Sequence, residues 1–465
     1  MGEALLVRRG GGGGSKIING ILQEYYAESD VVSADTFISF LENIPTTYLD
    51  GENSESLYPV SIQAIKMNDT KVMTILSSTY SQKIGCTVIE LGLNGPVIGT
   101  KTIFNAGSRY TAKRMVDIAY IKPSDTDAVL FFNTSAYDGK LVGLWVSADT
   151  ETNEVTVQAN PYEIDSSNAY LELITNAIKL ESNKFLIVAN RKVSSNYSLN
   201  AYALQTNTTM KTVTVNKLIL STTCKDYGSA PRLIRMSEEQ YCFFTSYGKV
   251  HTFNLDSTYS TVSNYLETQV VILSSTVKLK LYDICKISTN KAIVFFGQSS
   301  DKSLGASFIT INNGVANVDK TISEIVSFSS SFNYSPLFSL IYYEKGKITF
   351  YINLGGCKKI IFEVNEEANA LTLESNTDLF DSATDGTINP GASVPIIGGP
   401  YLVLPFTWNS LFMIIARTND SDSDYDEAFK VVRFKKTAVP ATSRIDGLTK
   451  NQLSTTQKGK VWTLE

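Results

Sequence analysis

ESNKFLIVA, residues 181–189, is a polar turn followed by a short run of aromatic, aliphatic and β-branched residues. Six further stretches repeat this pattern: MNDTKVMTIL (67–76), SDTDAVLFF (124–132), SEEQYCFFT (237–245), STNKAIVFF (288–296), EKGKITFYI (344–352) and GGPYLVLPF (398–406). The residues just after the turns recur every 51 to 57 residues, at Lys71, Asp127, Lys184, Gln240, Lys291, Lys347 and Tyr401. Each run has the composition of a β-strand, and the period is that of a four-stranded propeller blade with long loops. The sequence therefore predicts an all-β fold, a seven-bladed β-propeller.

The third and seventh copies indicate where the four strands of a blade lie. In the third copy the expected strands are AYLELITNAIK (169–179), KFLIVAN (184–190), SLNAYALQ (198–205) and KTVTVNKLIL (211–220). In the seventh they are SVPII (393–397), YLVLPF (401–406), LFMIIAR (411–417) and FKVVRFKK (429–436). Because the last copy supplies four strands of its own, we expect the ring to close by packing alone. The alternative is that TFISFLE (36–42) adds an edge strand to a neighbour.

Composition and charge exclude several classes of protein. The chain has 465 residues, 43% of them hydrophobic, which is enough to bury a large core. Its net charge is −5 and its Lys and Arg residues are scattered, so we expect no nucleic-acid partner and no anionic membrane. No segment approaches the roughly 20 apolar residues of a membrane span, and MGEALLVRRG lacks the apolar stretch of a signal peptide. Folding in a cytoplasm is therefore expected.

The five cysteines are spaced far apart, without a CxxC pair. Cys86, Cys242 and Cys285 lie within or beside apolar strand runs, so we interpret them as small core residues. An odd, unpatterned count argues against a disulfide framework.

The chain divides into three parts. Residues 1–56 are predicted to form an N-terminal attachment and oligomerisation module, residues 57–437 the propeller, and residues 438–465 a polar tail that begins with the linker AVPATSR. Within the first part, GGGGGSK (10–16) is interpreted as a flexible joint, because it lacks the Gly-Lys-Ser/Thr ending of a phosphate-binding loop. Between Ile17 and Tyr26 the apolar residues recur at i, i+1, i+4 and i+5, which predicts a helix with one apolar face.

Residues for catalysis are mostly missing, so we expect a protein that is not an enzyme. His251 is the only histidine, which excludes a zinc site built on several histidines, and no GxSxG elbow accompanies it. The enzymatic alternative is a glycoside hydrolase, since that chemistry needs only two carboxylates. Acidic residues on predicted loops could supply them: Asp138, Asp165, Asp226, Asp301 and Asp385. The SxDxGxTW boxes of sialidase-like blades are absent.

The acidic run NDSDSDYDEA (419–428) is the one candidate for a cofactor, a weak calcium site. Asp420, Asp422 and Asp424 stand at alternate positions and offer the oxygen ligands that calcium prefers. The run lacks the glycine at the sixth position and the glutamate at the twelfth, where Val431 stands, so a solvated loop is the alternative. We expect no other cofactor.

The predicted loops are rich in Tyr, Ser, Asn and Gly, as in NTSAYDGK (133–140) and SSSFNYSP (329–336). Tyrosine offers broad amphipathic contact area, and Ser and Asn offer adaptable hydrogen bonds. This composition suits sugars or protein surfaces, although ordinary propeller loops would also have it.

The two ends of the chain carry a resemblance to a known group of proteins. MGEALLVRRGGGGG (1–14) and IDGLTKNQLSTTQKGKVWTLE (445–465) resemble the ends of structural proteins of tailed bacteriophages and prophages of low-GC Gram-positive bacteria, over about 20 residues at each end. The resemblance implies a virion component made in the host cytoplasm and released by lysis. Such a component would be a tail fibre, a receptor-binding or baseplate-attached protein, or a head fibre.

The resemblance also implies partners. Other virion proteins would bind the N-terminal module in a symmetric, multi-copy or homo-oligomeric arrangement. The residues predicted for this attachment are Arg8, Arg9, Ile17, Ile21, Leu22 and Tyr25. In the tail, apolar residues are predicted to dock on the propeller or a neighbouring subunit: Leu448, Val461, Trp462 and Leu464. The expected function is display of the propeller for binding a bacterial cell-wall or surface glycan, and the alternatives are head decoration or a purely architectural role.

Overall fold

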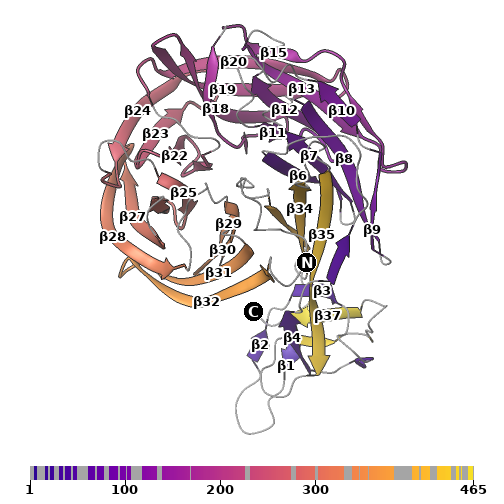
Figure 1. Ribbon diagram of the computed structural model, residues 1–465. Coiled ribbons are helices and arrows are strands. Elements are labelled where there is room, and N and C mark those ends of the chain that lie inside the picture. Colours follow the sequence, from indigo (N-terminus) through magenta and orange to yellow (C-terminus); the bar gives the residue numbers. More distant parts are fainter. Residues whose placement is uncertain are drawn as a thin grey trace.

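The computed structural model shows a ring of antiparallel β-sheets (Figure 1). It describes residues 5–7, 16–18, 21–25, 31–34, 37–42, 46–49, 61–68, 71–77, 83–92, 95–100, 102–105, 118–133, 139–167, 169–225, 231–273, 279–298, 302–328, 338–344, 346–353, 356–381, 401–407, 410–418, 427–440, 447–449, 452 and 459–463. Across these ranges every helix or strand assigned is a β-strand.

Six sheets follow one another along the chain, each with four or five strands. The first sheet contains β6 (Ser61–Lys66), β7 (Lys71–Ser77), β8 (Lys83–Gly92), β9 (Gly95–Ile98) and β10 (Thr102–Asn105). The second contains β11 (Ala119–Ile121), β12 (Asp127–Asn133), β13 (Leu141–Ala148), β14 (Val155–Val157) and β15 (Tyr162–Asp165). The third contains β16 (Tyr170–Ile174), β17 (Ile178–Lys179), β18 (Lys184–Val193), β19 (Asn196–Asn207) and β20 (Thr212–Ser221).

The next three sheets have four strands each in simple meander order. The fourth contains β21 (Leu233–Arg235), β22 (Gln240–Phe244), β23 (Lys249–Leu255) and β24 (Val262–Gln269). The fifth contains β25 (Leu279–Lys286), β26 (Lys291–Gln298), β27 (Ser303–Asn312) and β28 (Val315–Ser327). The sixth contains β29 (Phe338–Glu344), β30 (Lys347–Asn353), β31 (Gly356–Asn365) and β32 (Ala370–Asp381).

The seventh sheet combines strands from both ends of the chain. Its order is β3-β37-β36-β4-β35-β34-β33, and β5 also pairs with β35. The strands are β33 (Tyr401–Thr407), β34 (Ser410–Thr418), β35 (Glu427–Pro440), β36 (Gly447–Thr449), β37 (Gly459–Thr463), β3 (Ile21–Tyr25), β4 (Phe37–Glu42) and β5 (Thr46–Leu49). A separate two-stranded sheet pairs β1 (Leu5–Val7) with β2 (Lys16–Ile18).

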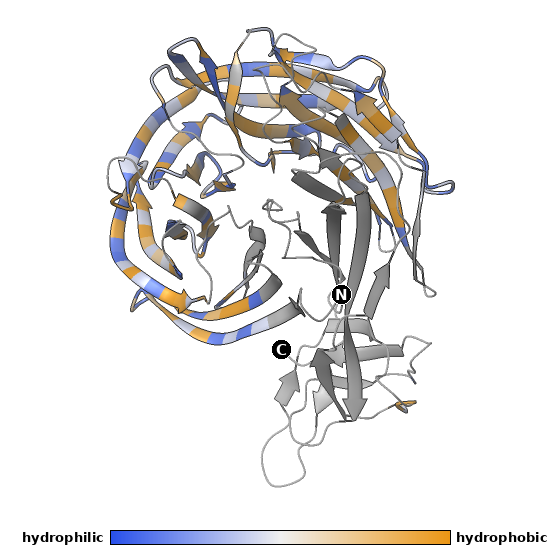
Figure 2. Ribbon diagram, viewed as in Figure 1, coloured by the Kyte–Doolittle hydropathy of each residue, from blue (hydrophilic) through white to orange (hydrophobic). Residues whose placement is uncertain are grey.

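The hydrophobic core lies between neighbouring sheets. One cluster joins the first sheet to the second through residues such as Ile75 and Leu130, and another joins the third to the fourth through Leu186 and Phe243. Equivalent clusters fill the spaces between the second and third, fourth and fifth, and fifth and sixth sheets. Figure 2 shows the orange apolar segments on the inner strands and more blue on the outer ones. Sheets that pack face to face around a ring form a β-propeller. The predicted fold class is therefore confirmed, and the count of seven blades stays a prediction.

Each of the seven positions that define the sequence period is the first residue of a strand: Lys71 of β7, Asp127 of β12, Lys184 of β18, Gln240 of β22, Lys291 of β26, Lys347 of β30 and Tyr401 of β33. Several of these residues also join adjacent sheets. Each of three lysines contacts the hairpin between the third and fourth strands of the next sheet: Lys71 at Asn153 (2.7 Å), Lys184 at the Tyr259 ring (5.2 Å to the centroid) and Lys291 at Asn369 (3.4 Å). We call these the anchor–hairpin contacts.

The hairpin residues in these contacts have a left-handed backbone, with φ of 61° at Asn153, 58° at Tyr259 and 48° at Asn369. Positive φ is uncommon outside glycine, and asparagine tolerates it best. These three hairpins therefore share a left-handed residue, which places a polar or aromatic side chain against the lysine of the preceding sheet.

The predicted helix between Ile17 and Tyr26 is wrong. β2 ends at Ile18 and β3 begins at Ile21, and the two strands pair with different partners. The physical reason is in the sequence: Asn19 and Gly20 form a dipeptide that favours turns and interrupts the apolar run.

Three of the four strands predicted for the last copy are present in the seventh sheet, as β33, β34 and β35. β33 contacts β29 and β6, the first strands of the neighbouring sheets, so it is the innermost of the described strands of this sheet. The outer edge of β35 is covered by N-terminal strands, with β5 opposite Lys430–Arg433 and β4 opposite Lys436–Pro440. An exposed edge strand carries unpaired backbone groups, which β4 and β5 satisfy here. The predicted strand SVPII (393–397) lies outside the described residues.

β35 also continues through Ala438, Val439 and Pro440, the first part of the predicted linker. The division of the chain at residues 56 and 437 stays a prediction.

Candidate functional site

Two segments far apart in the sequence, residues 21–25 and 459–463, form one small sheet beside the ring (Figure 1). β3 pairs with β37 from Ile21 opposite Thr463 to Tyr25 opposite Gly459. β37 pairs with β36, β36 pairs with β4, and β4 pairs with the end of β35. We call β3, β37, β36 and β4 the terminal sheet. It is continuous by hydrogen bonding with the last sheet of the ring.

A row of four paired positions crosses the terminal sheet. Leu22 is the partner of Trp462, and Trp462 is also the partner of Leu448. Leu448 is in turn the partner of Phe37. Residues opposite one another in adjacent strands lie on the same face of a sheet. Four large apolar residue types therefore occupy one face, and three of them, Leu22, Leu448 and Trp462, were predicted as attachment or docking residues.

The other predicted attachment and docking residues divide into two groups. Within the described residues, Ile21 and Tyr25 are the ends of β3, Val461 lies opposite Gln23 and Thr449, and Ile17 of β2 lies opposite Leu6 of β1. The remaining predicted residues lie outside the described residues: Arg8, Arg9, Leu464 and the calcium candidates Asp420, Asp422 and Asp424.

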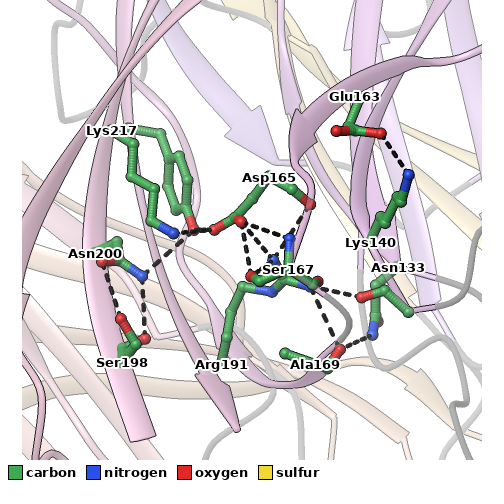
Figure 3. Close-up of polar contacts among 12 residues, drawn as sticks. Asn133, Lys140, Glu163, Asp165, Ser167, Ala169, Arg191, Ser198, Asn200 and Lys217 are labelled. Carbon is green, nitrogen blue, oxygen red and sulfur yellow. Dashed lines mark hydrogen bonds and ion pairs between the residues drawn. The ribbon is translucent and has the colours of Figure 1, made fainter. Parts of the chain in front are cut away.

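A second candidate site is a buried polar cluster between the second and third sheets (Figure 3). Asp165 ends β15, and Arg191 lies on β18 of the next sheet. The Arg191 Nη1 atom lies 3.1 Å from Asp165 Oδ1, and the two side chains are only 2% and 3% exposed. Tyr202 donates its hydroxyl to Asp165 Oδ2 at 2.7 Å, and Lys217 Nζ lies 2.7 Å from the same oxygen. The carboxylate is thus held by side chains of β18, β19 and β20.

Arg191 also binds the backbone of the connections around it. Its Nη2 donates to the carbonyls of Gly139 at 2.5 Å and Ser167 at 2.6 Å, while Nη1 donates to Ser167 Oγ at 2.7 Å. A planar guanidinium with several fixed donors suits such simultaneous contacts. Arg191 therefore ties the segment that enters the third sheet to the hairpin at Gly139.

The cluster keeps Asp165 ionised. Burial alone would raise the pKa of Asp165, but hydrogen bonds from Lys217, Tyr202 and Ser167 outweigh burial and hold the pKa far below its usual value. Burial raises the pKa of Tyr202 well above its usual value, and the adjacent Asp165 charge raises it further. A general acid or base needs a pKa near the working pH. Neither group meets that requirement, so the cluster is suited to holding two sheets together.

Asp165 was one of five acidic residues considered for glycoside hydrolysis. The other four, Asp138, Asp226, Asp301 and Asp385, lie outside the described residues. The roles of Arg191 and Tyr202 were missed. The available signal was an arginine that directly follows the apolar run KFLIVAN, since a buried charge is rare unless it is paired.

His251 is buried on β23. Its ring stacks on Phe243 with 4.7 Å between centroids, and its Nδ1 lies 3.1 Å from the Tyr265 hydroxyl.

Four cysteines are buried and form no disulfide: Cys86, Cys224, Cys242 and Cys285. Burial raises the pKa of Cys86 and of Cys285 to about 12 and that of Cys242 still further. Cys86, Cys242 and Cys285 are therefore small core residues, as predicted.

Comparisons with known proteins concern the fold. No protein-family model matches the chain, and no curated protein matches it. Among solved structures, the β-propeller domain of Swd1 from Myceliophteria thermophila is 9% identical, with a TM-score of 0.39, over 84% of this chain and 99% of that one. Sqt1 of Saccharomyces cerevisiae is 7% identical, with a TM-score of 0.43, over 87% and 99%.

The periplasmic gluconolactonase PpgL of Pseudomonas aeruginosa is 8% identical, with a TM-score of 0.42, over 75% of this chain and 94% of that one. Likenesses this distant give no activity, substrate or partner for the chain. In the described part of the chain, no helix has the length and apolar character needed to cross a membrane.

Proposed function

We propose that this chain is a structural protein of a tailed-bacteriophage virion, which displays its propeller for binding a glycan of the host cell surface. The observation that carries the proposal is the terminal sheet. The sequence segments that resemble virion proteins lie at the two ends of the chain, and in the C-terminal segment β37 pairs with β3 and β36, while β36 pairs with β4. The C-terminal segment that carries the resemblance thus forms one sheet with strands from residues 21–42, while β1 of the N-terminal segment pairs with β2 in a separate sheet.

The geometry of the terminal sheet supports a role in attachment. It lies outside the ring at the end of β35 (Figure 1), so a partner could hold it without covering the faces of the propeller. The connection through β35 is a continuous hydrogen-bonded strand and not a free linker. A propeller held in this way keeps a fixed orientation on a symmetric particle, which suits simultaneous binding of many copies to a surface.

The proposed role in host binding relies on the loops of the propeller. Their Tyr, Ser and Asn content suits weak contacts with sugars, and many copies on one particle would multiply weak contacts into firm attachment. A tail or baseplate location is proposed on this ground. Head decoration and a purely architectural role would use the same terminal sheet without glycan binding.

Immunogold labelling of particles from the lysate that contains the protein tests the proposal. Label at the tail tip or baseplate is the expected result, and a pull-down with purified cell-wall glycan would then test binding. Label on the head would indicate a decorating role in place of host binding. Particles that carry no label, in a lysate where the protein is detected by immunoblot, would overturn the virion role.

A further inference from the structure

Three side chains with metal-binding atoms meet at the junction of the third and fourth sheets. Cys224 follows the end of β20, His251 lies on β23, and Glu267 lies on β24. The thiol sulfur, an imidazole nitrogen and a carboxylate oxygen of these residues all lie within 4.8 Å of one another. His251 and Glu267 are direct partners in the β23–β24 register, so the strand pairing itself sets two of the three positions.

The set of atoms suits zinc. Zn²⁺ binds thiolate sulfur, imidazole nitrogen and carboxylate oxygen in a tetrahedral arrangement, and a site with three protein ligands keeps its fourth position for water. Cys224 and His251 are buried, at 3% and 0% exposure, while Glu267 is exposed. The cluster is therefore closed on the side of the sheets and open to solvent on the side of the carboxylate.

The surroundings of His251 fix its ring for such a role. Phe243 stacks on the ring with an interplanar angle of 5°. Nδ1 lies 3.1 Å from the Tyr265 hydroxyl, and if Nδ1 carries the proton, Nε2 is the nitrogen that can act as a metal ligand. Histidines that bind metals commonly donate their second ring N–H to an oxygen in this way.

Cys224 is held through its backbone. Its carbonyl accepts a hydrogen bond from the Asn190 side chain at 3.3 Å, across the inner strands of the third sheet. This contact fixes the chain just after β20, where it leaves the third sheet for the fourth. The thiol therefore approaches the other two groups from a fixed segment of the preceding sheet.

The nearest competitor for Glu267 is Lys249. Its ammonium pairs with Oε1 of the carboxylate. A carboxylate has two oxygens, so Oε2 remains for a metal ion while Oε1 keeps the lysine. A positive charge at this position lowers the affinity for a cation without blocking the site.

From this geometry we propose that Cys224, His251 and Glu267 bind a single zinc ion, with solvent as the fourth ligand. Binding converts the Cys224 thiol to a thiolate and releases its proton to solvent, with no change of oxidation state. The ion joins the exit of the third sheet to the outer half of the fourth.

Cobalt is the probe for this site, because tetrahedral Co²⁺ with a thiolate ligand has visible and near-ultraviolet absorption bands that Zn²⁺ abolishes when it displaces cobalt. The full chain is purified without a histidine tag, and since His251 is its only histidine, no other imidazole contributes. The expected result is saturation at one Co²⁺ per chain with a thiolate band, and displacement by one Zn²⁺.

Variants distinguish metal binding at this site from adventitious binding elsewhere on the protein. Cys224→Ser removes the thiolate band, and Glu267→Gln, a change at an exposed residue, weakens cobalt binding at least about tenfold. Lys249→Gln binds as tightly as the parent or tighter, and Cys285→Ala, which removes another free cysteine, binds unchanged. Circular dichroism confirms that each variant is folded. Absence of saturable binding to the folded parent, or full binding by both Cys224→Ser and Glu267→Gln, would overturn the proposal.

Discussion

Lys71 Nζ lies 2.7 Å from the Asn153 side-chain oxygen, across the interface between the first and second sheets. The same ammonium lies 3.2 Å from Glu90 of its own sheet, and the Lys71 side chain is only 9% exposed. This contact shows what the repeat in the sequence does. At Lys71, Lys184 and Lys291 the residue that marks the beginning of a copy also fastens that copy to the next one.

Replacing Lys71 with methionine should lower the free energy of unfolding by about 2 kcal/mol, because hydrogen bonds to charged groups are lost while Asn153 and Glu90 remain. Urea unfolding followed by tryptophan fluorescence measures the change. Lys140→Met is the control, since Lys140 forms an ion pair with Glu163 at the surface, with 36% and 47% side-chain exposure. It should cost less than about 1 kcal/mol. Equal losses in the two variants would contradict a special role for the anchor–hairpin contact.

Gly99 should not tolerate a side chain, because a Cβ at this position would lie 2.2 Å from the backbone oxygen of Asn153. The same hairpin that binds Lys71 therefore also packs closely against the segment after β9. Gly99→Ala should cost about 1–3 kcal/mol by forcing the two sheets apart. Differential scanning calorimetry measures the loss. A Gly99→Ala protein with unchanged Tm would show that the hairpin can move without cost.

Arg191→Met should be among the most damaging single changes in the described part of the chain. It leaves the Asp165 carboxylate buried beside Tyr202 with only the half-exposed Lys217 for charge, and removing one partner of a buried pair costs about 3–5 kcal/mol. Lys140→Met is the control, because Lys140 and Glu163 form a nearby ion pair at the surface. Chemical unfolding should separate the two variants by at least about 2 kcal/mol. If they differ by less, the cluster contributes little to stability.

Asp165 should also make stability depend on pH in the acid range. Its pKa in the folded protein lies far below the value of about 3.9 expected in the unfolded chain, so the unfolded state binds more protons there. The stabilising contribution is fully present above the unfolded pKa and is lost as pH falls toward the folded pKa. Unfolding midpoints measured between pH 6 and pH 3 should fall less steeply for Asp165→Asn than for the parent. Parallel curves would mean that Asp165 titrates normally.

Strands determined by a local sequence pattern were predicted correctly, whereas strands that depend on pairing with a distant segment were not. All seven positions of the period, from Lys71 to Tyr401, begin strands, because each turn and apolar run is a local signal. β5 was missed because Thr46–Leu49 is a strand only through its pairing with Lys430–Arg433, some 380 residues away in the chain. The helix prediction failed because it gave more weight to apolar periodicity than to the turn dipeptide at Asn19 and Gly20.

The same limit applies to the sites. Leu22 was predicted on the apolar face of a helix, and Leu448 and Trp462 as apolar residues of a polar tail, but only the register of β3, β37 and β36 brings them into one row. Arg191 had no local partner in the sequence. Its contacts with Gly139 and Asp165 arise from the packing of two sheets.

N-terminal truncations also remove strands of the seventh sheet, so their end points decide what they test. Removing residues 1–56 would delete β4 and β5 and expose the edge of β35, so we expect a chain that aggregates or unfolds at a lower denaturant concentration. Removing residues 1–30 keeps both strands and deletes β1, β2 and β3. This shorter deletion should leave the unfolding of the propeller nearly unchanged while abolishing incorporation into particles, as measured by immunoblot of purified virions. Normal incorporation of the 31–465 protein would exclude β3 from attachment.

Trp462→Ala tests the row of the terminal sheet without deleting any strand. Position 462 is opposite both Leu22 and Leu448, and cross-strand aromatic pairs contribute about 0.2–1 kcal/mol each, so the loss should be about 1 kcal/mol. When local opening is fast relative to cleavage, that loss should raise the rate of proteolysis within residues 21–25 about fivefold. The midpoint for global unfolding of the propeller should not change. Thr463→Ala, at the next position of β37, is the control and should leave the cleavage rate unaltered. If both variants are cleaved at the parent rate, the row does not hold the terminal segments together, and attachment must depend on other residues of the two ends.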